Sequence, residues 1–194
     1  MGHTIDLSAH PPERLSAAIR DVLTGAPDAL GGRLPSAEHL KQGAEAVTHD
    51  QPGSAAVHFQ SLLEIGYLVA SADGFAEEER HALAALLEAV LGRAVSHDDL
   101  ELHFKDLDAA VEMLGRRERL RRAAEDFEED LGRSEALGFA ALVAVADGRL
   151  AEPEAAALDE LGSFLGLEAA EVEAAIDRVV GDIKTRLADK EGTQ

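Results

Sequence analysis

Two similar stretches decide the fold of this chain: LVASADGFAEEER at residues 68–80 and LVAVADGRLAEPE at residues 142–154. In each, a run of apolar residues ends in Ala-Asp-Gly and an acidic stretch follows. When the chain is shifted by 74 residues, 12 of the 30 positions from 63 to 92 carry the same residue as their counterparts. The uncommon pairs Asp-Gly and Leu-Gly are among them, which favours an internal duplication. We therefore expect two helix pairs related by a pseudo-twofold axis.

The segments around these turns have the spacing of helices. Residues 55–72 and 135–146 are apolar around nearly their whole circumference, which is typical of helices in the middle of a bundle. Other helices are predicted at 11–23, 36–48, 77–91, 96–115, 117–131, 152–165 and 169–187. Aromatic residues make up only 4% of the chain, so the core must come from Leu, Val, Ile and Ala. The expected fold class is all-α, a helical bundle with an internal pseudo-twofold repeat.

The chain divides at a break that contains Pro and Gly and lies just before Ser54. Residues 1–53 form an N-terminal extension with the amphipathic helix 11–23, a loop rich in Gly and Pro, and a short helix. Residues 54–190 form the main helical domain, and Ser54 is expected to cap its first helix. The N-terminal helix could fold back on the bundle or exchange between chains, so the oligomeric state stays open.

Composition limits the classes of function. The chain has no Cys, which excludes disulfides and thiolate metal sites and fits a reducing compartment, so a cytoplasmic location is expected. It has no secretory leader and no apolar run long enough to cross a bilayer, so neither secretion nor membrane insertion is expected. A net charge of -20 disfavours nucleic-acid binding and attracts cations and basic proteins, although acidity could also serve solubility alone.

Motifs of catalysis are missing from the sequence. There is no nucleophile elbow, no zinc-protease helix and no phosphate-binding glycine loop, so the chain is predicted not to be an enzyme. The 8 His are scattered. Two pairs at helical spacing could ligate a metal, namely Asp99 with His103 and His97 with Glu101. Such pairs on an exposed helix are usually solvated, and we favour that interpretation.

The Ala-Asp-Gly turns carry the strongest functional signal. In a structural interpretation, Gly74 and Gly148 take the left-handed position that ends their helices, and the glutamates that follow complement the dipole of the next helix. This leaves the aspartates unexplained, because a carboxylate at a helix C-terminus faces the negative pole. Alternatively, the turns bind a divalent cation such as Ca, Mg, Mn or Zn. The candidate ligands are Asp73, Glu77, Glu78 and Glu79 in the first turn and Asp147, Glu152 and Glu154 in the second.

An ordinary EF-hand loop fits neither turn. Aligning Asp-Gly with loop positions 5 and 6 puts Val69 or Val143 at position 1, where an acidic ligand belongs. Position 12 falls on Arg80 in the first copy and on Glu154 in the second. A cation site here would therefore differ from an EF-hand, and helix capping is the favoured interpretation.

The order of buried helix, Ala-Asp-Gly, acidic stretch and Leu-Gly, occurring twice, resembles the TerB-like family over about residues 58–178. This family includes a tellurite-resistance protein and a domain of a membrane-anchored J-domain cochaperone. The resemblance implies an all-α fold with an internal pseudo-twofold, no catalysis, acidic residues that bind divalent metal, and a role in stress-response assemblies, some at a membrane. Asp73, Asp147 and Glu154 match the family's acidic positions. Arg80 replaces an expected glutamate, so either Glu79 serves instead or that half has lost its ligand.

Five arginines gather at the start of the helix predicted at 117–131: Arg116, Arg117, Arg119, Arg121 and Arg122. Acidic residues fill its second half, which is the reverse of what the helix dipole prefers. The arginines could pair with this protein's own acidic surface or form a docking patch for an acidic protein partner. Two functions stay open: a noncatalytic protein-interaction module in a stress-response assembly, and a divalent-metal-binding or sensing protein.

Overall fold

The computed structural model describes residues 5–24, 37–48, 53–74, 80, 83–84, 87 and 97–191. Its helices are α1 (Pro12–Thr24), α2 (Ala37–Thr48), α3 (Ser54–Ala70), α5 (His97–Leu114), α6 (Arg116–Ala124), α7 (Asp130–Ala144), α8 (Glu152–Phe164) and α9 (Ala169–Glu191). In the described ranges, extended pairing is limited to one isolated bridge between Asp6 and Arg149. The all-α class is therefore confirmed. Most of the helix predicted at 77–91 lies outside the described residues.

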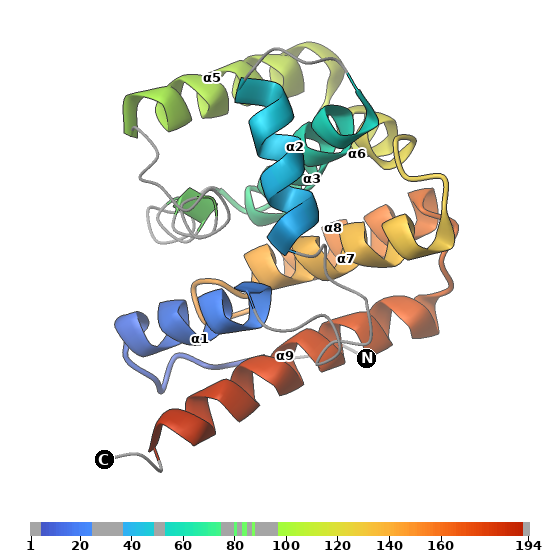
Figure 1. Ribbon diagram of the computed structural model, residues 1–194. Coiled ribbons are helices and arrows are strands. Elements are labelled where there is room, and N and C mark those ends of the chain that lie inside the picture. Colours follow the sequence, from blue (N-terminus) through green and yellow to red (C-terminus); the bar gives the residue numbers. More distant parts are fainter. Residues whose placement is uncertain are drawn as a thin grey trace.

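Helices α3 and α7 lie at the centre of the bundle (Figure 1). They pack against each other, α2 and α6 pack on α3, and α8 and α9 pack on α7. Every residue from 136 to 146 is buried, as are residues 65–71, which comprise the end of α3 and its C-cap. Gly66 permits this close approach, because a Cβ there would lie 3.0 Å from a ring carbon of Phe139. The prediction that both apolar segments are central is confirmed.

The N-terminal helix α1 folds back along α9 (Figure 1). Leu7, Leu15 and Ile19 are each at most 3% exposed and belong to the same hydrophobic core as the central helices. Leu40 of α2 joins that core as well. The division of the chain before Ser54 stays a prediction about its organisation, but the described residues on both sides of it share one core. None of the helices, within the described residues, is long and apolar enough to cross a membrane.

Two predicted helix boundaries are wrong. The helix expected at 117–131 is split, because α6 ends at Ala124 and α7 begins only at Asp130. Phe127 lies in the intervening turn, where it is buried and stacks on the His58 ring with 5.4 Å between centroids. Phe127 is therefore buried as the apolar spacing predicted, although it lies in a turn and not in a helix. Ser54 is the first residue of α3, and Gly53 occupies the N-cap with extended backbone. Ser96, the first residue of the helix predicted at 96–115, lies outside the described residues.

Candidate functional site

The two Ala-Asp-Gly turns have the same backbone hydrogen bonds. In the first, the Gly74 N–H donates to the Ser71 carbonyl at 3.4 Å, and in the second, the Gly148 N–H donates to the Val145 carbonyl at 3.0 Å. Both glycines have positive φ, +118° and +95°. Ser71 and Val145 are the C-caps of α3 and α7, so each glycine lies three residues beyond its cap. The expectation that the glycines directly end the helices is therefore wrong: each closes a separate tight turn, whose positive φ favours glycine.

The acidic residues of the second turn stabilise the turn itself and the start of α8. The Asp147 carboxylate accepts the backbone N–H of Arg149 at 2.7 Å, which closes the turn after α7. Glu154, buried at 2% exposure, accepts the backbone N–H of Ala151 at 2.7 Å. Glu152 is exposed in the first turn of α8, where its charge complements the helix dipole. Asp147 thus gains a hydrogen bond that the sequence alone does not reveal.

The second turn is covered by residues 5–8, which we name the N-terminal cover. The Leu7 N–H donates to the Gly148 carbonyl at 2.6 Å, and the Leu150 N–H donates to the Ile5 carbonyl at 3.4 Å. A Cβ on Gly148 would lie 3.1 Å from the Leu15 side chain and 3.3 Å from the Ser8 nitrogen. Asp6 accepts both the N–H and the hydroxyl of Ser8, and these bonds hold its pKa below the usual aspartate range.

The first turn has no such cover among the described residues. Asp73 and Gly74 are exposed, and a Cβ on Gly74 would meet no described atom within 4 Å. Arg116 of α6 holds this turn instead. Its guanidinium donates to the backbone carbonyls of Leu68 and Ser71 and, at 2.9 Å, to the Ser71 hydroxyl. These donors satisfy carbonyls that the end of α3 would otherwise leave open.

A cation site at these turns stays a prediction. Within the part of the chain that the structure describes, there is no group of three His, Asp or Glu side chains that could hold a metal. Glu77, Glu78 and Glu79, the expected partners of Asp73, lie outside that part. In the second turn all three predicted ligands are described, and two of them already accept backbone N–H groups.

All five clustered arginines have partners within the chain. Besides Arg116, Arg119 pairs with Glu64 of α3 through its Nε at 2.6 Å. Arg117 pairs with Glu160 of α8 and lies 5.2 Å from the centroid of the Phe164 ring. The cluster therefore ties α6 to α3 and α8, which supports the internal-pairing interpretation. A docking patch for an acidic partner stays a prediction, and such a partner would have to compete with these carboxylates.

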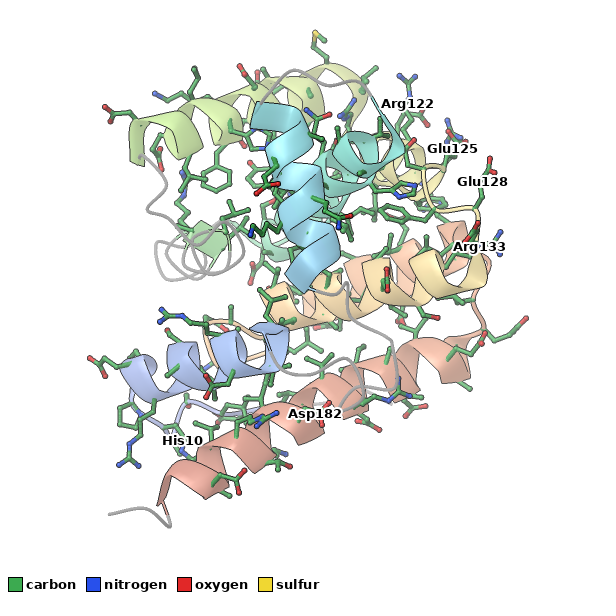
Figure 2. The ribbon with its side chains drawn as sticks, in the orientation of Figure 1. His10, Arg122, Glu125, Glu128, Arg133 and Asp182 are labelled. Atoms are coloured by element: carbon green, nitrogen blue, oxygen red, sulfur yellow. The ribbon has the colours of Figure 1, made fainter. Side chains whose placement is uncertain are left out.

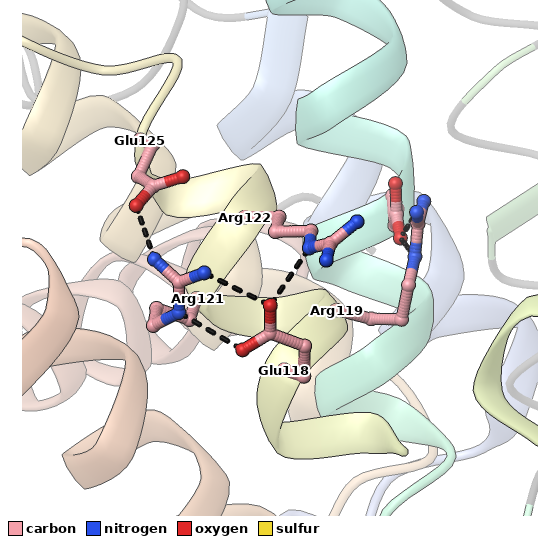
Figure 3. A network of polar contacts seen from close by, with 6 residues as sticks. Glu118, Arg119, Arg121, Arg122 and Glu125 are labelled. Carbon is pink, nitrogen blue, oxygen red and sulfur yellow. Dashed lines mark hydrogen bonds and ion pairs between the residues drawn. The ribbon is translucent and has the colours of Figure 1, made fainter. Parts of the chain in front are cut away.

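The remaining two arginines form a network on the surface of α6 (Figure 3). Glu118 receives hydrogen bonds from Arg121 at 2.9 and 3.0 Å and from Arg122 at 2.8 Å, and these bonds lower its pKa to about 2. Arg121 also contacts Glu125. Arg122, Glu125 and Glu128 project from the same edge of the molecule (Figure 2). Because α6 ends at Ala124, the acidic residues that follow lie outside it. Glu118 offsets the arginines of the first turn, and Arg121 and Arg122 in the last turn suit the helix dipole.

The histidine pairs proposed as metal ligands have other surroundings where they are described. Glu101 forms an ion pair with Arg80 at 3.2 Å. The Nε2 atom of His103 is buried without a hydrogen-bond partner, and burial lowers the pKa of this imidazole. The side chains of His97 and Asp99 lie outside the described residues. The sequence predicted that Glu101 shares a helix face with His97, but it did not predict the ion pair of Glu101 with Arg80.

Two polar features of the helices have no signal in the sequence. The Tyr67 hydroxyl of α3 donates to Asp108 of α5, and the Tyr67 ring stacks on Phe104 with 5.6 Å between centroids. Burial and this hydrogen bond raise the pKa of Tyr67. On α9, Asp182 (Figure 2) has a buried carboxylate oxygen with no hydrogen-bond partner, and burial raises its pKa.

Comparison with known proteins gives no relative for this arrangement: no family model, no curated protein and no solved structure matches the chain.

Proposed function

We propose that this chain is a noncatalytic module for protein–protein interaction that uses its acidic surface to bind a basic protein partner. One observation carries the proposal. The chain has 38 Asp and Glu against 18 Lys and Arg, and the strongest basic cluster, on α6, is engaged in pairs within the chain. The field outside the molecule is thus dominated by carboxylates, which attract a basic protein surface and steer its approach.

The same proposal includes the internal duplication and the TerB-like character of the bundle. The matching hydrogen bonds of the turns at Gly74 and Gly148, together with the packing of α3 against α7, support a shared origin for the two halves. As the TerB-like resemblance implies, the module would work in a cytoplasmic stress-response assembly, in some cases next to a membrane-bound partner.

The test of the proposed function starts from cross-linked partners recovered with the full chain in its native host. Each candidate is then purified and its affinity for the full chain is measured at low and at high salt. We expect the specific partner to present a basic contact surface and to bind more weakly as salt rises, since salt screens exposed charges. A specific partner whose binding is indifferent to salt, or whose contact surface is acidic, would contradict the proposal.

A divalent-cation sensor is the second candidate, and the exposed Asp73 favours it, because this turn has the same geometry as its counterpart and three glutamates follow in the sequence. The melting temperature of metal-stripped protein is measured with millimolar calcium, magnesium, manganese or zinc. A ligand that binds only the folded state at about 100 times its Kd stabilises it by about 2.7 kcal/mol. The sensor hypothesis requires a rise that Asp73→Asn removes, and it is abandoned if no cation raises the melting temperature.

A further inference from the structure

Helix α5 carries apolar side chains on two opposite faces. Its inner face holds Leu100, Phe104 and Leu107, each at most 7% exposed. Its outer face holds Leu102 and Met113, which are 61% and 80% exposed. These two residues are separated by about three helical turns, or roughly 16 Å along the axis, so they point in nearly the same direction. An amphipathic helix that only covered the core would be polar on this outer side.

The outer apolar residues form one stripe. Ala109 lies between Leu102 and Met113 on the same side of α5 and is exposed as well. Of the four large hydrophobic residues that are exposed in the described part of the chain, three belong to α5, and the fourth is Val57 of α3. Scattered exposed apolar residues are normal, but their concentration on one helix marks a candidate contact surface.

The rim of this stripe is acidic. The exposed charged residues on the same side of α5 are Asp98, Lys105, Asp106 and Glu112. Three of these four side chains are carboxylates. Helix α5 also lies along the edge of the molecule farthest from α9, so a partner can approach it from outside the bundle (Figure 1).

We propose that the outer face of α5 docks a cationic amphipathic segment of the partner protein. The apolar face of that segment lies on Leu102, Ala109 and Met113, and its Lys and Arg residues meet Asp98 and Asp106. This inference rests on the proposed function and adds to it the surface and the kind of partner. Apolar contact supplies affinity, and the charged rim selects a basic segment over an acidic one.

Charge separates this occupant from two others. In a second copy of the chain, the same acidic rims would face each other, and like charges in an interface cost binding energy. A bilayer surface attracts helices whose polar face is rich in Lys and Arg, and the anionic lipids would repel this rim. The acidic rim therefore favours a basic protein segment.

The test uses two synthetic helical peptides with the same lysines, one with leucines and the other with serines on the opposite face. Binding of each to the full chain is measured by fluorescence anisotropy at low salt. We expect the leucine peptide to bind at least about tenfold more tightly, because burial of a leucine or methionine is worth more than a factor of ten in affinity. In the double variant Leu102→Ser and Met113→Ser, this ratio is expected to fall close to one.

Two controls make the test specific. Val57→Ser removes an exposed apolar side chain from α3 and is expected to keep the tenfold ratio. Asp98→Asn with Asp106→Asn is expected to weaken both peptides and to leave their ratio in place, since it removes charge and no apolar contact. Circular dichroism checks that each variant is folded, which is expected because all these side chains are exposed.

The outcomes distinguish this inference from the proposed function. If both peptides bind in a salt-sensitive way but the double variant keeps the tenfold ratio, the α5 site is wrong and the acidic interaction module stands. If neither peptide binds, the proposed function fails with it. Sedimentation velocity supplies a further outcome: a dimer that the double variant abolishes would show that a second copy occupies this face, and that would overturn the inference.

Discussion

The two Ala-Asp-Gly turns share their sequence and their backbone hydrogen bonds but are held by different devices. At the turn around Gly148, the N-terminal cover (residues 5–8) forms backbone hydrogen bonds with the turn and packs against it. The turn at Gly74 is held from α6 by the charged side chain of Arg116, and its Asp73 stays exposed. Similar local sequences therefore produce similar turns, while their exposure depends on contacts with distant parts of the chain.

The largest effect is expected from removing the cover of the second turn. Leu7 is 2% exposed and belongs to the core, and truncation of a buried leucine leaves a cavity. Leu7→Ala is expected to lower the free energy of unfolding by about 3 kcal/mol, measured by urea denaturation. Hydrogen exchange at the amide of Leu150 should accelerate at the same time, while that of Gly74 should not. Equal acceleration at both turns would mean that they are not held independently.

The glycines offer a matched pair of substitutions. At Gly74, an alanine Cβ would meet no described atom within 4 Å, so the expected cost is the strain of positive φ, about 1 kcal/mol. At Gly148, the same strain adds to close contacts with Leu15 and Ser8, so Gly148→Ala is expected to cost about 2 kcal/mol. Thermal unfolding of both variants measures the difference. If Gly74→Ala proves the more damaging, then the first turn is more tightly surrounded than the second.

The sequence predicts the two turns but not the contacts that hold them. Apolar periodicity and the repeated Ala-Asp-Gly predicted α3, α7 and their turns, because these depend on residues close in the chain. The hydrogen bond between Leu7 and Gly148 joins segments that are far apart in the sequence. The local residue pattern of neither segment predicts its contact with the other. For the same reason, the sequence shows that the arginine cluster is unusual but does not predict that Glu64 and Glu160 are its partners.

The candidate site was predictable only in its residue types. Asp147 and Glu154 stand out in the sequence as acidic residues beside the turn. The backbone N–H groups that they accept, on Arg149 and Ala151, follow from the path of the chain after α7. The outer face of α5 was missed for a different reason, since Leu102 and Met113 lie outside the helical spacing of the buried apolar residues of this helix. Both cases show that a periodic pattern specifies an element before it specifies the element's neighbours.

Removing the Arg116 hydrogen bonds at the first turn is expected to give the next largest loss of stability. Arg116→Met keeps the apolar part of the side chain but removes the donors to Leu68 and Ser71. Hydrogen bonds that involve a charged group contribute more than neutral ones, so a loss of about 1.5 kcal/mol is expected in urea denaturation. Arg117→Met is the matched control on the same helix, where an exposed ion pair should contribute at most about 0.5 kcal/mol. Equal losses of unfolding free energy in the two variants would show that the Arg116 bonds to Leu68 and Ser71 add no particular stability.

A smaller difference is expected between the two aspartates. Asp147→Ala removes the acceptor of the Arg149 N–H and should cost about 1 kcal/mol, as is typical of a single hydrogen bond. Asp73 is exposed, and Asp73→Ala should cost less in metal-free buffer. Both are measured by thermal unfolding in the presence of a chelator. A larger loss for Asp73→Ala would show that its carboxylate stabilises the first turn through a contact of its own.

The smallest effect concerns the charge in the N-terminal cover. The pKa of Asp6 is lowered chiefly by its side-chain hydrogen bond with Ser8, so folding favours the ionised carboxylate. A lowered pKa in the folded state contributes stability above the ordinary aspartate pKa, and that contribution is lost as the pH falls below about 4. Once the intrinsic pH dependence of exchange is divided out, the protection of the Leu150 amide should therefore fall on acidification, whereas Asp6→Asn should show a flatter dependence on pH. If the variant keeps the full pH dependence, groups other than Asp6 control the release of the cover, and the second turn is opened by acid through a different contact.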